Sequence, residues 1–141
     1  MAPIGGEPPV GSGNTFTGAA ETLEIIGEHA YAYSGAFGAS SNSQEVLNFQ
    51  SGNFTAVGRF VFSGAFKPGT PQNGTESSMV LKFNNGTVGV LKNTGGSETG
   101  PTFSWLEVVI PPYTNVNVTV ESATSDSDLL TTVSFVGRLY R

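Results

Sequence analysis

The chain of 141 residues has the length of a single domain. Only 12% of its residues are charged, and 19 glycines and 8 prolines accompany a hydrophobic share of 38%. This composition favours strands joined by turns and excludes a helical bundle. The net charge of −5, with six scattered basic residues, argues against nucleic acid and membranes as partners.

Reactive side chains are few. The sequence has no cysteine, and His29 is its single histidine. Disulfides, thiolate metal sites and histidine-clustered metal sites are therefore excluded, and His29 has no evident nucleophile or orienting group to work with. Asp126 and Asp128 supply two carboxylates in an expected polar loop, too few ligands for a dedicated calcium site. We expect no enzyme activity, no cofactor and no metal.

The N-terminal residues differ in composition from the rest. Residues 1–18 hold five glycines, three prolines, one charge and the isolated apolar residues Ile4, Val10 and Phe16. They predict an extended arm over residues 1–19, ahead of a domain over residues 20–141. Two interpretations stay open: a disordered tail, or a segment that becomes ordered along a neighbouring subunit. The chain start lacks the basic and apolar regions of an export signal, and no membrane-spanning run is present.

From Glu21 onward, apolar and polar residues alternate between turn signals, which is typical of an antiparallel sandwich or barrel. The first half predicts strands over residues 22–26, 28–37, 44–50 and 54–66. Along these strands, one face of each carries large apolar side chains: Leu23 and Ile25, then Tyr31, Tyr33 and Phe37, then Leu47 and Phe49, then Phe60, Phe62 and Phe66 opposite Arg59.

The second half repeats the pattern, with strands expected over residues 77–84, 87–92, 102–110, 113–121 and 130–140. Asn84-Asn85-Gly86 predicts a tight hairpin, because Asn-Gly tolerates positive φ angles. Residues 122–128 are expected to form a polar loop. The predicted inward faces carry Met79, Leu81 and Phe83, then Val116, Val118 and Val120, then Val133, Phe135 and Leu139.

Eight strands follow from Glu28 onward, with no helical stretch. They predict an all-β fold, specifically an eight-stranded antiparallel jelly-roll sandwich with an extended N-terminal arm and one short extra strand. An immunoglobulin-like sandwich is the alternative. The lack of cysteine and the strand count argue against it.

The strand around Trp105, the single tryptophan, has two different faces. Phe103 and Trp105 lie on one face with Glu107, and aliphatic residues occupy the other. If the aliphatic face is the core, Phe103 and Trp105 are exposed aromatics suited to a subunit contact or to a ligand such as a sugar. The alternative is a strand that is buried on both sides or shifted at a bulge.

Four segments carry a resemblance to a known family: Glu28–Gly35, Thr55–Phe62, Val109–Val120 and Val133–Tyr140. Through them, the chain from Glu28 to Arg141 resembles small jelly-roll virion proteins of tailed bacteriophages. The resemblance implies a head decoration, or cement, protein that is made in the host cytoplasm and resides on the outer surface of the capsid.

In such a protein the major capsid protein is the partner. The arm would pair with strands of capsid subunits, with Ile4, Val10 and Phe16 as capsid-contact residues. Self-association as a trimer or dimer would add avidity. The alternative function is a receptor- or glycan-binding module of a tail spike or fibre, with Trp105 and the loops over residues 67–73 and 93–100 as the contact region.

Overall fold

The structure is a computed structural model that describes residues 23–66, 76–94, 103–123 and 125–140. Within these ranges every regular element is a β-strand, and all paired strands run antiparallel. The predicted all-β class is therefore confirmed. The arm over residues 1–19, with Ile4, Val10 and Phe16, lies outside the described residues.

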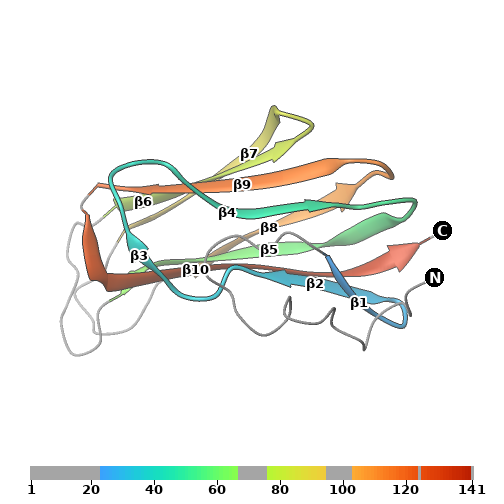
Figure 1. Ribbon diagram of the computed structural model, residues 1–141, viewed down its shortest axis with the longest axis horizontal. Coiled ribbons are helices and arrows are strands. Elements are labelled where there is room, and N and C mark those ends of the chain that lie inside the picture. The colour runs from blue at the N-terminus through green and yellow to red at the C-terminus, as the bar shows by residue number, and fades with distance from the viewer. Residues whose placement is uncertain (1–22, 67–75, 95–102, 124, 141) are drawn as a thin grey trace.

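The strands form two sheets (Figure 1). One sheet has the order β1 (Glu24–Ile26), β2 (His29–Tyr33), β10 (Asp126–Tyr140), β5 (Thr55–Phe66) and β8 (Phe103–Ile110), with β3 (Phe37–Ala39) also paired to β10. The other has the order β4 (Gln44–Gln50), β9 (Asn115–Ser122), β6 (Glu76–Phe83) and β7 (Gly86–Thr94). We call them the six-stranded and the four-stranded sheet.

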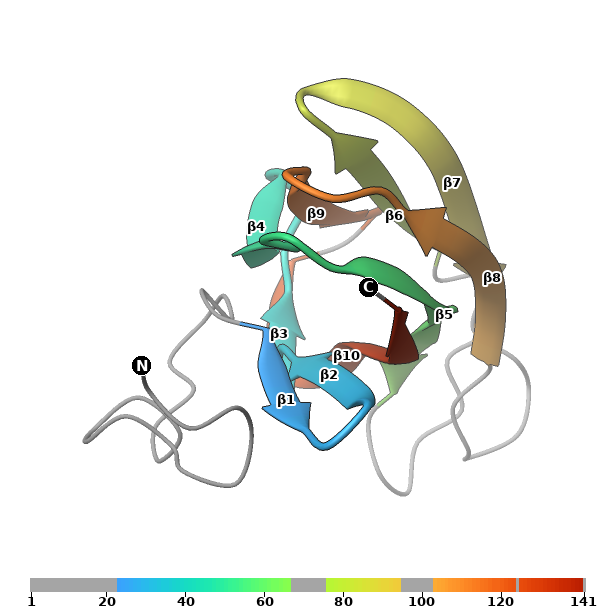
Figure 2. The ribbon, with the colours of Figure 1, turned by 90° about the vertical axis from the view of Figure 1, so that its right-hand side faces the viewer.

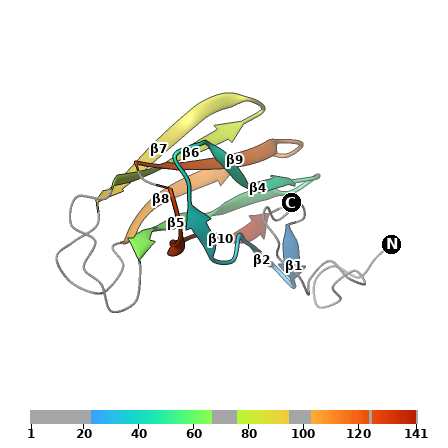
Figure 3. The ribbon, with the colours of Figure 1, turned by 60° about the vertical axis from the view of Figure 1, so that its left-hand side comes forward.

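The two sheets face each other as layers. Seen with the strands running toward the viewer, β7 and β8 lie side by side along one margin, and β4 lies above β1 along the other (Figure 2). The chain crosses between the layers where it passes from β3, beside β10, to β4 (Figure 3). The space between the layers is therefore the place for the hydrophobic core.

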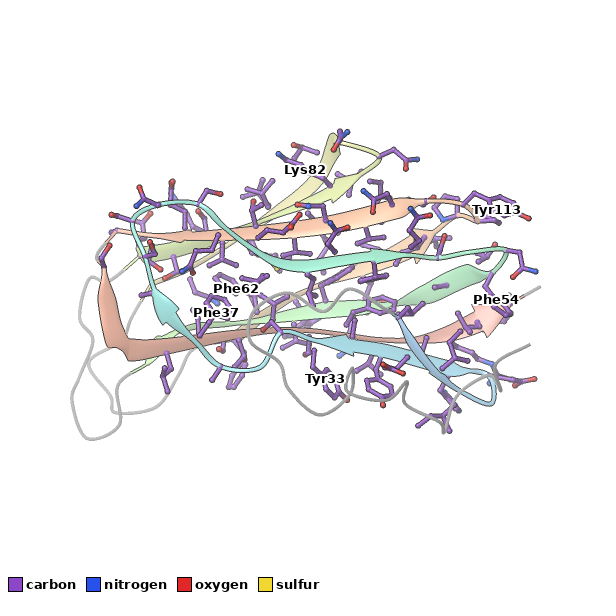
Figure 4. All side chains as sticks on the ribbon, in the orientation of Figure 1. Tyr33, Phe37, Phe54, Phe62, Lys82 and Tyr113 are labelled. Atoms are coloured by element: carbon purple, nitrogen blue, oxygen red, sulfur yellow. The ribbon has the colours of Figure 1, made fainter. Side chains whose placement is uncertain are left out.

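Both sheets contribute to one core. Phe135 of β10 is fully buried, and its ring centroid lies 4.8 Å from that of Phe60 in β5 and 5.9 Å from that of Phe49 in β4. Figure 4 shows Phe62 between the layers. On most strands the face with the large apolar side chains is the inward one, since the following side chains are buried: Leu23, Leu47, Phe49, Phe60, Phe62, Met79, Leu81, Val116, Val118, Val120, Val133, Phe135 and Leu139. On β2 the inward face is the opposite one: Ala30 and Ala32 are buried, and Tyr33 is exposed.

A pair of inward-facing glycines makes room for the ring of Phe135. Gly58 of β5 pairs with Gly137 of β10. A Cβ atom on Gly58 would lie 2.2 Å from the carbonyl oxygen of Val136, and one on Gly137 would lie 2.8 Å from the ring of Phe135. The two longest strands can approach each other here, and the ring can cover them, because neither position carries a side chain.

The described residues form ten strands, so the predicted count of eight strands after a short extra one is wrong. The strand predicted over residues 28–37 is two strands, β2 and β3, and both pair with β10. Between them, the amide of Val133 donates to Oγ of Ser34 at 2.9 Å, and Gly35 has a φ of 70°. A side-chain oxygen thus replaces a backbone acceptor, and the ladder is interrupted.

The predicted hairpin between β6 and β7 is present. Its turn is centred one residue earlier than a turn formed by Asn85 and Gly86 would be. Strand β6 ends at Phe83 and β7 begins at Gly86, so Asn84 and Asn85 are the central residues, with φ angles of 51° and 69°. Two positive φ angles at the centre of a two-residue loop are those of a type I′ turn. Asn84 Oδ1 also accepts a hydrogen bond from the amide of Asn115 at 2.9 Å.

The last strand begins earlier than predicted. Strand β10 starts at Asp126 rather than at Leu130, so the second part of the expected polar loop over residues 122–128 belongs to the sheet. Its pairing with β3 shifts in register between Asp126 and Leu130. The polar composition that predicted a loop is compatible with an irregular strand end at the margin of a sheet.

The glycine pair yields a stability prediction. We expect Gly58→Ala to lower the free energy of unfolding by about 1–3 kcal/mol, because the new methyl group would meet the backbone of β10. Gly86→Ala is the control, since its Cβ would have only an ordinary contact, 3.5 Å from the carbonyl oxygen of Phe83. Urea unfolding followed by circular dichroism measures both. Equal midpoints for the two variants would contradict this account of the pair.

Candidate protein-binding face

The outer face of the six-stranded sheet exposes large apolar side chains. On β8, Phe103, Trp105 and Val109 are 61%, 57% and 58% exposed. The opposite side of the strand faces the core, where Leu106 and Val108 pack and Ile110 is buried. The exposed aromatics expected from the alternation are confirmed, and the alternative of a strand buried on both sides is wrong.

Arg59 of β5 stands at the centre of this face. It pairs in register with Glu107 of β8, and its Nη2 atom lies 3.5 Å from Oε1 of that carboxylate. Its guanidinium carbon lies 5.7 Å from the centroid of the Trp105 ring, within the range of a cation–π contact. Both charged side chains are more than half exposed, so the pair contributes little to stability as it stands.

Apolar residues surround the Arg59–Glu107 pair. Val57 and Val61 flank Arg59 along β5, and Val136 of β10 lies opposite it in the register. The same alternation that turns Phe60 and Phe62 inward turns these residues outward. We name this surface the outer patch; its members are Val57, Val61, Phe103, Trp105, Val109 and Val136, around Arg59 and Glu107.

Two tyrosines extend the outer patch toward β2. Tyr31 lies opposite Val136 in the register, and Tyr33 lies opposite Ser134. Their ring centroids are 4.9 Å apart, and Tyr33 points away from the core (Figure 4). The outer face of the six-stranded sheet therefore carries aromatic side chains both on β8 and on β2.

The outer face of the four-stranded sheet has a different character. Amide and carboxylate side chains lie on β4 and β9, where Glu45 accepts hydrogen bonds from Asn48, at 3.3 Å, and from Asn117. Lys82 points outward from β6 (Figure 4). Among the described residues, the large exposed hydrophobics of this sheet are Val88 and Val90 of β7. Among the described residues of the two sheets, the exposed aromatic side chains are therefore on the six-stranded sheet, and the outer face of the four-stranded sheet is the more polar one.

A hollow of about 400 Å³ lies at the end of the six-stranded sheet where β2, β5 and β10 meet. Its walls include an ion pair between Arg138 and Glu28, with Nη2 and Oε2 2.5 Å apart, and the ring of Tyr140 at 5.9 Å from the guanidinium carbon. The other described residues that line it are Gly27, Phe54 and Leu139. Because Glu28 already neutralises Arg138, the hollow has no unpaired charge from this pair to offer a ligand.

A second hollow, of about 260 Å³, lies where β6, β7 and β9 meet. Lys92 and Glu76 form an ion pair on its wall, with Nζ and Oε1 2.9 Å apart. The hydrogen bond to Glu76, and then the charge of that carboxylate, raise the pKa of Lys92 above its usual value. Lys92 therefore remains protonated at neutral pH, and this exposed pair is a feature of the solvated surface.

The described residues hold no group of three or more histidine, cysteine, aspartate and glutamate side chains able to bind a metal. His29 is exposed on β2, where its strand position lies opposite Arg138. Among the described residues there is also no helix with the length and apolar character needed to span a membrane. The described surface thus presents apolar and polar side chains through which the domain can contact other molecules.

The sequence-predicted site residues fall into two groups. Phe103 and Trp105 lie on the outer patch. Ile4, Val10 and Phe16 and the loop over residues 67–73 lie outside the described residues. The loop predicted over residues 93–100 begins too early, because Asn93 and Thr94 are the last residues of β7, and residues 95–100 lie outside the described residues. Val57, Val109 and Val136 were not predicted from the sequence as surface residues. The signal was available, because each alternates with a predicted core residue on its own strand.

Comparison with protein-family models and with curated protein sequences finds no match to this chain. The surfaces of the domain are therefore the basis for inferring its function.

The exposure of Trp105 yields a second prediction. Trp105→Ala should lower the free energy of unfolding by less than about 1 kcal/mol, because the ring is exposed and loses mainly its contact with Arg59. Phe60→Ala should lower it by about 3–5 kcal/mol, because that ring is fully buried. Thermal and urea unfolding by circular dichroism compares the two. A loss at Trp105 as large as that at Phe60 would show that the ring serves folding and not contact.

Proposed function

We propose that the domain is a jelly roll. The support is the pairing order of eight strands, which leaves out β1 and β3. The outermost pair along the chain is β2 with β10, and the pairs nested inside it are β4 with β9, β5 with β8 and β6 with β7. This is one long antiparallel hairpin of four pairs, wrapped so that successive pairs fall alternately in the two sheets. Strands β1 and β3 are additions to that scheme.

We further propose that the protein is a structural component of a tailed-phage particle, which binds the outer surface of the capsid and stabilises it as a decoration or cement protein. The observation that carries this proposal is the contrast between the two faces of the domain. An apolar, aromatic surface around an arginine is typical of protein–protein interfaces, and the opposite polar face suits solvent.

In this proposal the arm supplies the contact with the major capsid protein. Residues 1–19 would lie along strands of adjacent capsid subunits, where backbone hydrogen bonds give affinity and Ile4, Val10 and Phe16 fix the position. Separating those subunits would then also require removing the arm. The net charge of −5 suits a position outside the shell, away from the packaged DNA.

A glycan-binding module of a tail spike or fibre is the second candidate, and the exposed ring of Trp105 is the observation that favours it. Stacking of a sugar requires a free ring face. The guanidinium of Arg59 already lies over this ring, which favours a protein contact over a sugar contact. A glycan array decides between the two: specific binding supports the spike, and its absence supports the shell.

Binding to shells is the direct test of the decoration function. We expect the full chain to co-sediment with particles of its own virus that lack it, and a variant without residues 1–15 to stay in the supernatant. Circular dichroism of the truncated protein is the control for folding. Undiminished co-sedimentation of the truncated protein would remove the arm from the mechanism, and failure of the full chain to bind would contradict the function.

A pair of point variants tests the kind of contact that the arm makes. Phe16→Ala should weaken attachment by about 1.5–3 kcal/mol if the ring becomes fully buried on the capsid. Glu7→Ala should weaken attachment much less, because it removes no large apolar side chain. Titration of particles with labelled protein measures both affinities. Equal losses would indicate a polar contact instead.

A further inference from the structure

We propose that the outer patch binds the same patch of a second copy, so that the protein forms a two-fold dimer through its six-stranded sheets. The juxtaposition that carries this inference is an arginine and a glutamate side by side in the middle of an apolar surface. The inference rests on the proposed function, for which it specifies the self-associating surface and its symmetry. It can be tested on the isolated protein, without particles.

Charge balance favours a second copy as the occupant. The whole chain carries a net charge of −5, so two copies repel each other over most approaches. The outer patch is neutral, because Arg59 and Glu107 are its two charged members. A surface with one cation beside one anion is complementary to itself, which is the requirement for a two-fold interface.

The strand register shows how the two copies would meet. Consider a two-fold axis that lies in the interface, parallel to the strands and midway between β5 and β8. This axis places β5 of one copy on β8 of the other at the same level. Each residue then faces the cross-strand partner that it has in its own sheet: Arg59 faces Glu107 of the second copy, and Val61 faces Trp105 of the second copy.

The contacts made in this arrangement are favourable along the whole strand pair. Val57 would face Val109 of the second copy, so apolar residues flank the central charges on both sides. Sheets pack face to face at about 10 Å, a spacing that valine and tryptophan side chains fill. Burial would cost both ions their hydration, and the contact of each ion with its opposite in the second copy would offset that cost, because the guanidinium has five donors to share between two carboxylates.

Two charge-reversal variants test whether the outer patches of two copies contact each other. Arg59→Glu leaves the patch with two acids, and Glu107→Arg leaves it with two bases. Sedimentation velocity and native mass spectrometry should find the unmodified protein as a dimer and each variant alone as a monomer, with dimerisation weakened at least tenfold. An equimolar mixture of the two variants should form a heterodimer, because an acidic patch then faces a basic one.

Lys82→Glu is the matched control. It makes the same change in charge on the outer face of the four-stranded sheet, where Lys82 points away from the core, and it should leave the dimer intact. Recovery of the heterodimer also shows that both variants are folded. A monomeric or trimeric unmodified protein, variants that still dimerise alone, or a mixture that stays monomeric would each overturn the inference. None of these outcomes affects the separate test of arm-dependent binding to particles.

Discussion

The pairing of β5 with β10 is the contact on which the rest of the domain depends. These two longest strands run side by side in one ladder from Thr55–Tyr140 to Phe66–Leu130, with one register shift near its far end. The ladder fixes which residues face each layer: Phe60, Phe62 and Phe135 turn inward and fill the core. The period of two then forces Arg59 and Val136 outward, so the core and the candidate interface are specified together.

The six-stranded sheet carries apolar side chains on its outer face as well as on its inner one. The core is already complete on the inner side, where Phe135 links the layers through Phe49 and Phe60. The valines and aromatics outside are therefore additional to what folding needs. Apolar groups that folding does not require, gathered around one ion pair, are best explained by a partner that covers them.

Strict alternation made most of the fold predictable from the sequence. Leu47, Met79 and Val118 were placed inward correctly, since each lies in a run with one apolar face. The errors occurred where side chains replace backbone partners or where composition misleads: Ser34 interrupts the strand before β3, and Asp126 begins a strand although its neighbours are polar. For the site, Phe103 and Trp105 were found on their own strand. Their position on the same surface as Arg59 and Val136 could not be predicted, because a single sequence does not show the order of the strands in the sheet.

A cryo-electron microscopy map of intact particles of the kind that the proposed function implies would test the central claim most directly. The account predicts two-layered β-density of this size on the outside of the shell, with extended chain leading from the β1 end across neighbouring capsid subunits. Density for the protein confined to the tail, or no density for it on the particle, would contradict the account.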